Sequence, residues 1–158
     1  MTQELLNGLK PASPFPSSLP QLRVVQLNPG TDYVYRFEEF NKTNTNSSVK
    51  VLYQIGPMDL STNATLAFIA HLVKEPAFNE LRSQEQLGYI VHTSIDTCGD
   101  DIKGLIFLIQ SDSYAPVHLD NRIEAFVDRF RSNIMNMSPE EFQTHVEAVA
   151  KSFLEKVR

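Results

Sequence analysis

The 158-residue sequence is short of cysteine, of positive charge and of long hydrophobic runs, and each shortage excludes a class of protein. Cys98 is the only cysteine, so no disulfide can form within the chain, which favours a reducing compartment. The net charge of −5 and the scattered lysines and arginines argue against a nucleic-acid partner, which would need a clustered basic face. No stretch approaches the roughly 18–20 consecutive apolar residues of a membrane span.

The N-terminus also lacks the basic start and the apolar stretch of a secretory signal. We therefore expect a cytoplasmic protein without a membrane partner. Its 42% of apolar and 21% of charged residues are ordinary for a globular chain that buries one core.

Proline marks the first boundary in the chain. Residues 10–20 hold four of the nine prolines, mixed with serines, and proline removes backbone donors and fixes φ. We therefore expect 1–20 to end in an extended, proline-rich tether and a domain to occupy 21–158. The helical pattern still runs at the C-terminus without a glycine stop, which suggests a domain cut short from a longer polypeptide.

Three strands are predicted in the first part of this domain. Residues 22–27 are β-branched and apolar, and an Asn-Pro-Gly turn follows them. Residues 33–37 and 49–55 both alternate between apolar and polar side chains, the pattern of a half-buried strand. The polar loop between them predicts an antiparallel hairpin.

The middle of the chain predicts two helices and a second hairpin. Ser61 or Thr62 can cap a helix that runs to about residue 74, and Pro76 is expected to break it. A short helix over 77–85 should follow. Strands are then predicted over residues 87–95 and 104–110, joined by a turn around Cys98.

The last third is helical. Apolar residues recur with helical spacing from Leu119 to Met137, and Ser138-Pro139 then begins another helix as N-cap and first helical residue. Glu141 completes a capping box with Ser138. Strands followed by helices, twice over, predict an α+β fold with a mostly antiparallel sheet and helices packed on one face.

The sequence holds no recognisable catalytic motif of its own. No two of its four histidines stand three or four residues apart on one helix, the spacing that helical zinc sites need, and His-x-x-Glu-His is absent. His71 is more simply a helix-surface histidine than a metal ligand. We therefore expect no metal ligands and no bound cofactor in this chain, and no independent catalysis.

Arg82 and Tyr89 allow two interpretations. In the simpler one Arg82 is a solvated helix charge, and Tyr89 is a strand residue with its ring in the core. In the other, the guanidinium binds carbonyl or carboxylate oxygens and the phenol stabilises a developing oxyanion. Gly88 beside Tyr89 lets backbone approach closely, which suits a substrate surface or a tight packing contact.

The segment around these two residues carries a resemblance. Leu-Arg-x-x-x-Gln-Leu-Gly-Tyr, at residues 81–89, resembles a signature of the insulysin/pitrilysin family of zinc metallopeptidases. The likeness extends over about residues 19–158 and includes Met-Ser-Pro-Glu-Glu-Phe at 137–142. The segment of the family that it resembles lies in the half that carries no zinc.

The resemblance implies a specific architecture. Those enzymes contain four homologous α+β domains of the mitochondrial-processing-peptidase type, arranged as two halves around a chamber, and only the first domain carries the zinc motif. This chain is similar to the fourth domain (21–158), with the tail of the third at 1–20. Arg82 and Tyr89 then match family residues that hold the substrate and stabilise the tetrahedral intermediate.

The resemblance thus implies a non-catalytic fragment of a zinc endopeptidase. Zinc would belong to the parent enzyme, and the partners would be a peptide substrate and the N-terminal half of the parent. The alternative is a catalytically silent structural or interaction domain of the same fold, in which Arg82 is a surface charge. A chain that binds zinc itself is disfavoured by the histidine spacing.

Overall fold

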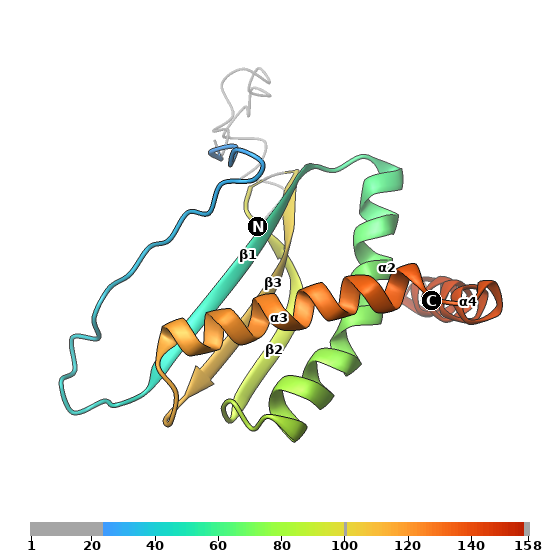
Figure 1. Cartoon of the computed structure of the whole chain (residues 1–158). Coiled ribbons are helices and arrows are strands. Elements are labelled where there is room, and N and C mark those ends of the chain that lie inside the picture. Colours follow the sequence, from blue (N-terminus) through green and yellow to red (C-terminus); the bar gives the residue numbers. More distant parts are fainter. Residues whose placement is uncertain (1–23, 100, 157–158) are drawn as a thin grey trace, which may run out of the picture.

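The computed structural model describes residues 24–99 and 101–156 (Figure 1). The tether predicted for residues 1–20 lies outside this range, as does the end of the last helix pattern. In chain order the elements are β1 (Ser47–Pro57), α2 (Leu60–Ala77), η2 (Phe78–Gln84), β2 (Ile90–Thr97), β3 (Ile102–Ser111), α3 (Pro116–Met135) and α4 (Pro139–Lys156).

The sheet has three strands in the order β1-β3-β2, and both pairings are antiparallel. The second predicted hairpin is therefore present as β2 and β3. β3 is central because its residues are the most apolar of the three strands, with Leu105, Phe107 and Ile109 buried on one face. The predicted α+β class with an antiparallel sheet is confirmed.

Helices α2 and α3 cover that face of the sheet (Figure 1). The ring of Phe107 packs edge-on against Phe126 of α3, with 5.9 Å between the ring centres. Leu119, Ile123 and Phe126 form the predicted stripe of α3, and all three are fully buried. The core is thus one layer of side chains between the sheet and two helices.

Pro76 does not break the second helix, contrary to the prediction. It lies inside α2, and the helix continues through Ala77 into η2, a π-helix. A proline lacks one backbone donor and crowds the carbonyl four residues before it, but here it costs α2 one bond without ending the helix. The wider π-helical turn begins only at Phe78, after the proline. The N-cap is Asp59, whose carboxylate accepts from the Thr62 N–H at 2.6 Å, so the prediction of Ser61 or Thr62 as the cap is wrong.

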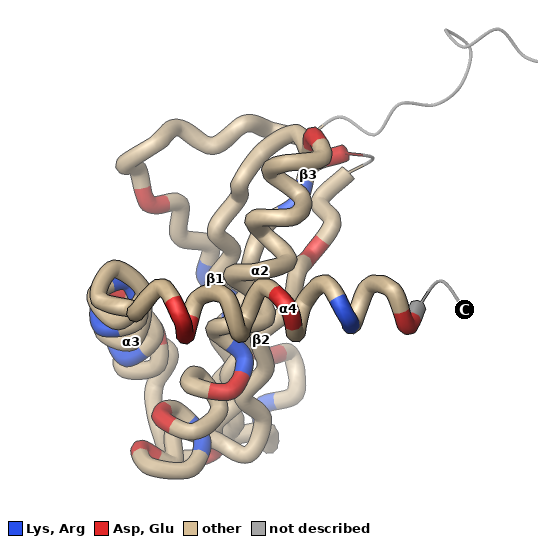
Figure 2. Tube along the Cα trace, turned by 90° about the vertical axis from the view of Figure 1, so that its right-hand side faces the viewer, with Lys and Arg blue, Asp and Glu red and all other residues tan. Residues whose placement is uncertain are grey.

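The N-cap predicted for α4 is confirmed, but the described residues show no return bond from the Ser138 N–H to the Glu141 side chain, so the predicted capping box is only half formed. The Glu141 N–H donates to the Ser138 hydroxyl at 3.1 Å, so Ser138 caps the helix. Phe142 then packs edge-on against Phe68 of α2, with the ring centres 5.0 Å apart. Figure 2 shows the C-terminal end of α4 projecting beyond the rest of the molecule. Much of the apolar stripe of α4 consequently stays accessible.

Residues 24–46 contain no strand, so the strands predicted at 22–27 and 33–37 are not observed in the described residues. The hairpin predicted between 33–37 and 49–55 is therefore absent there, although the strand predicted at 49–55 is present as β1. The segment runs well away from β1 along most of its length (Figure 1). Its attachment is the Gln54 side chain, which donates to the Val25 carbonyl and accepts from the Leu27 N–H. Alternating apolar and polar residues form a half-buried strand only where another segment or helix covers the apolar side. Among the described residues no such cover exists, because Tyr35 is 86% exposed.

Charges of both signs are interspersed over the helices, as Figure 2 shows for α3 and α4. Exposed ion pairs include Lys42–Glu38 and Lys50–Asp96. Within the described ranges, no helix combines the length and apolar character needed to cross a membrane.

Candidate functional site

The candidate site is the junction where η2 ends and β2 begins. The π-helical turn closes with the Glu85 N–H donating to the Glu80 carbonyl at 2.9 Å. The Leu87 N–H then donates to the Leu81 carbonyl at 3.0 Å, and both leucine side chains are buried. This bond joins the two arms of the junction, so Arg82 and Tyr89 each lie within two residues of it.

The backbone between these anchors is constrained. Gln86 has φ of +53°, a left-handed conformation that residues other than glycine adopt at some cost. Gly88 presses on the central strand: a Cβ there would lie 2.0 Å from the Gln110 carbonyl oxygen. The close approach predicted for Gly88 is therefore a packing contact with β3. The backbone of residues 86–88 therefore has little freedom to adopt a different conformation.

Arg82 lies in the last turn of η2 and is half-buried, whereas Tyr89 precedes β2 and is 54% exposed. The simpler interpretation of Tyr89, a ring in the core, is therefore wrong. Neither side chain makes a hydrogen bond or an ion pair within the described part of the chain. A guanidinium and a phenol without protein partners keep their donors available for a ligand.

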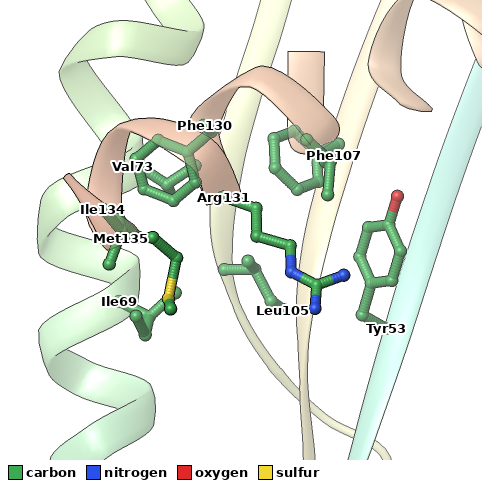
Figure 3. Close-up of a pocket in the computed structure, with 10 residues that line it drawn as sticks. Tyr53, Ile69, Val73, Leu105, Phe107, Phe130, Arg131, Ile134 and Met135 are labelled. Atoms are coloured by element: carbon green, nitrogen blue, oxygen red, sulfur yellow. The ribbon is translucent and has the colours of Figure 1, made fainter. Parts of the chain in front are cut away.

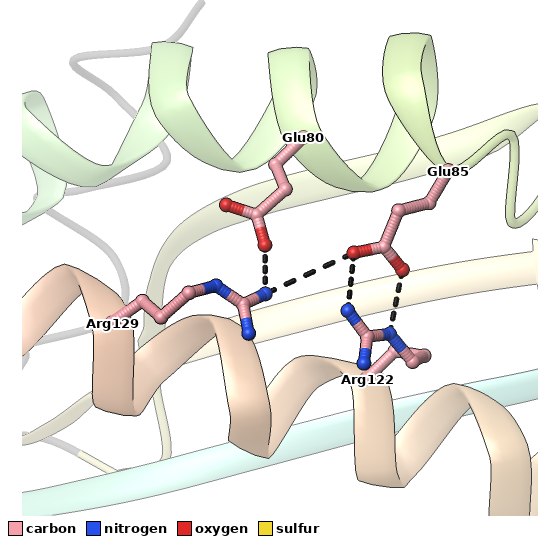
Figure 4. A network of polar contacts seen from close by, with 4 residues as sticks. All are labelled: Glu80, Glu85, Arg122 and Arg129. Carbon is pink, nitrogen blue, oxygen red and sulfur yellow. Dashed lines mark hydrogen bonds and ion pairs between the residues drawn. The ribbon is translucent and has the colours of Figure 1, made fainter.

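Four charged side chains join η2 to α3 behind this junction (Figure 4). Arg122 donates to both carboxylate oxygens of Glu85, through Nε at 2.7 Å and through an Nη at 2.5 Å. Arg129 donates to Glu80 and lies 3.8 Å from Glu85. The carboxylates of Glu80 in η2 and of Glu85, which caps its C-terminus, therefore share two guanidinium groups of α3. We call these four residues the η2–α3 clamp.

The clamp fixes the protonation state of Glu85. The hydrogen bond from Arg122 lowers the pKa of Glu85 below its ordinary value, and the charges of Arg122 and Arg129 lower it further. The same hydrogen bond raises the pKa of Arg122. Glu85 is thus ionised at neutral pH and accepts two charge-assisted hydrogen bonds. Sequence reasoning missed the clamp because nothing in the spacing of these residues pairs them.

A second feature is an apolar hollow between α2, the sheet and the end of α3 (Figure 3). Its volume is ≈ 310 Å³, and an adjoining hollow of ≈ 270 Å³ shares Tyr53, Ile69 and Leu105 with it. Figure 3 shows Arg131 extending between Phe107 and Tyr53. The lining is almost wholly hydrophobic, so the hollow lacks the convergent polar groups of a catalytic site.

The described residues do not fit a zinc ion. Within 24–99 and 101–156, no three His, Cys, Asp or Glu side chains are grouped so that they could hold a metal. His71 and His145 face one another from α2 and α4, with 5.8 Å between the ring centres, but no third ligand joins them. We therefore derive no metal-dependent step from the side chains of this chain.

The part of the chain that contains the junction is similar to known proteins. Residues 68–158 match the family model "PQQ synthase PqqF-like, C-terminal lobe domain 4". Insulin-degrading enzyme of Homo sapiens is 37% identical over 141 residues, which are 89% of this chain and 13% of that protein. The peroxisomal insulin-degrading enzyme-like 1 of Arabidopsis thaliana is 36% identical over 90% of this chain and 14% of its own length.

The fold has a solved counterpart as well. The crystal structure of pitrilysin superposes with a TM-score of 0.62 at 29% sequence identity, covering 71% of this chain and 12% of that one. This chain therefore spans about an eighth of the length of the proteins that it resembles.

Proposed function

The chain belongs to the insulysin/pitrilysin family of zinc peptidases, as a domain of the C-terminal half, and we propose that it contributes Arg82 and Tyr89 to a peptidase active site that it shares with another part of the polypeptide. The N-terminal half would supply the zinc site and the general base. Together the two halves would enclose the substrate chamber. This chain alone would then be inactive.

The exposure of Tyr89 on a fixed backbone is the observation that supports this proposal most directly. Its phenol is accessible, while Gly88 beside it is wedged against Gln110 and Leu87 is buried. An accessible donor on a rigid support is what electrostatic stabilisation requires, because no reorganisation is then needed during the reaction. A tyrosine in the core could not serve this role.

The chemistry of the two side chains suits hydrolysis of a peptide bond. Water attack on the scissile carbonyl moves negative charge onto its oxygen, and the Tyr89 O–H would donate a hydrogen bond to that oxygen. Arg82 would donate to carbonyl oxygens of the bound peptide and keep the scissile bond aligned. Loss of one such oxyanion donor costs about 10²–10³-fold in kcat in other enzymes.

The partners would be a peptide substrate and the N-terminal half of the same protein. We propose a cytoplasmic location, although the Arabidopsis relative named above is peroxisomal. The second candidate function, a catalytically silent packing domain, is favoured by one observation. The apolar side chains of α4 remain accessible, including Leu154 at 70%, as expected of a surface that meets another domain.

Reconstitution distinguishes the two functions. The 158-residue chain would be mixed with the zinc-loaded N-terminal half of the same protein, and cleavage of a quenched fluorescent peptide followed. We expect activity only in the mixture, with kcat lowered roughly 10²-fold by Tyr89→Phe. Tyr114→Phe is the matched control, since Tyr114 is also partly exposed but stacks on His118. Full activity of both Tyr89→Phe and Arg82→Ala would reject the proposed roles, and binding without activity would indicate a packing domain.

A further inference from the structure

The charged residues of η2 and of its C-cap divide into two sets. Glu80 and Glu85 turn towards α3 and are held there by Arg129 and Arg122 (Figure 4). Arg82 lies between them in sequence and makes no such bond within the described residues. The two carboxylates thus fix the helix from one side and leave the guanidinium between them available.

We propose that the η2–α3 clamp positions Arg82 and Tyr89, and that the Glu85–Arg122 pair is its principal part. This inference rests on the proposed function, because it assigns positioning residues to the same reaction. The clamp residues would not touch the substrate. They would act by holding the backbone from which the two donors extend.

The geometry of Gln86 explains why Glu85 matters most. Gln86 has a left-handed φ between two fixed neighbours: the Glu85 side chain, held by Arg122, and Leu87, which is buried and bonded to Leu81. A non-glycine residue keeps such a conformation only where its surroundings impose it. Without the Arg122 bonds, the segment can relax towards an ordinary φ. Tyr89, three residues further on, would then move.

The form of the contact also suits a positioning role. Arg122 binds Glu85 through two parallel N–H groups, and a planar fork fixes orientation as well as distance. Both side chains are largely shielded, with 33% and 21% exposed, so water competes little for these bonds. By contrast, Arg131 on the same helix makes no ion pair within the described part of the chain. Arg131 is therefore a matched control for the loss of an arginine from α3.

The test uses the reconstituted enzyme described above. Glu85→Gln is nearly isosteric and weakens the fork, and Arg122→Lys keeps the charge but removes the bidentate geometry. We expect each variant to lower kcat at least tenfold with a smaller change in KM, because a displacement of about 1 Å can cost up to 10²-fold in rate. Arg131→Gln should leave kcat unchanged.

A double-mutant cycle separates positioning from general destabilisation. If the clamp acts through Tyr89, Glu85→Gln should lower kcat much less in a Tyr89→Phe background than in the unaltered chain. Fully additive effects, or an unchanged kcat for both Glu85→Gln and Arg122→Lys while Tyr89→Phe is impaired, would overturn the clamp proposal alone. A silent Tyr89→Phe would overturn the proposed function and the clamp together.

Amide hydrogen exchange on the 158-residue chain provides a readout that needs no activity. The Leu87 amide, bonded to Leu81, should exchange at least tenfold faster in Glu85→Gln than in the unaltered chain, while amides of β3 keep their rates. Equal exchange at Leu87 in both chains would overturn the clamp. If Glu85→Gln does not fold, the same comparison with Arg122→Lys decides the question.

Discussion

The phenol of Tyr53 on β1 donates a 2.7 Å hydrogen bond to the carboxylate of Glu124 on α3. The bond links the outer strand of the sheet to the helix that crosses it. Burial raises the pKa of Tyr53, and the hydrogen bond to Glu124 raises it further, so the phenol stays protonated throughout the physiological range. The hydrogen bond therefore links the sheet to α3 at every pH in this range.

Removing this hydroxyl should weaken the fold. Tyr53→Phe keeps the ring contact with Phe107 and loses the bond to Glu124, so we expect the free energy of unfolding to fall by about 1 kcal/mol. Urea denaturation measures the change. Tyr114→Phe removes a hydroxyl that has no hydrogen-bond partner in the described residues and should change the stability much less. Equal losses in the two variants would show that the Glu124 bond contributes nothing.

The pH dependence of stability should report the Glu85–Arg122 pair. In the folded chain the pKa of Glu85 lies below its ordinary 4.5, so the unfolded state takes up this proton more readily. The stabilisation is therefore fully present above pH 4.5 and is lost as the pH falls through the folded pKa. Glu85→Gln should cost about 1–2 kcal/mol at neutral pH and little in acid, measured by urea unfolding across this range.

The control for that experiment is Glu38→Gln. Glu38 pairs with Lys42 at 2.8 Å, but both side chains are largely exposed, so little stability should be lost. Two variants with the same pH profile would contradict a specific contribution from Glu85.

Gly88→Ala should destabilise the chain by about 1–3 kcal/mol, because the new methyl group would collide with the Gln110 carbonyl and force β3 and the junction apart. Thermal unfolding measures this loss. Gly30→Ala reports backbone strain alone, since its Cβ would meet nothing within 4 Å but its φ of +70° disfavours alanine. A Gly88→Ala chain as stable as the unaltered chain would mean that the close approach is easily relieved.

The attachment of α4 should depend on Phe142. The centre of its ring lies 5.0 Å from that of Phe68, and the His71–His145 contact lies about one turn further along both helices. Phe142→Ala should lower the stability by about 1–2 kcal/mol, less than for a fully buried phenylalanine, because 48% of the side chain is exposed. Hydrogen exchange should accelerate along α4 but not along β3. Uniform acceleration would show that α4 unfolds only together with the core.

The sequence predicted best where one local signal was sufficient. The stripe of Leu119, Ile123 and Phe126 is buried as its spacing indicates, and Ser138 caps α4. Prediction failed where the outcome depends on a partner surface. Residues 33–37 alternate like a strand, yet no strand lies beside them in the described chain, since pairing is a property of two segments.

The candidate site was predictable only in part. Arg82 and Tyr89 could be named from their resemblance to a family signature, but composition alone favoured a core position for Tyr89. The Glu85–Arg122 pair spans 37 residues, and no local pattern joins residues so far apart. Its partners become visible only when the path of α3 across the sheet is known.

The π-helical turn of η2 determines which way the carboxylates of Glu80 and Glu85 point. At 3.6 residues per turn, side chains five positions apart differ by about 140° around a helix, so in an α-helix Glu80 and Glu85 could not both face α3. A turn closed by a bond between residues i and i+5, as between these two residues, is wider and brings their side chains much closer in angle. Deleting one residue between them would restore α-helical winding and leave the two carboxylates four positions apart, about 40° around the axis, so that both would still face α3.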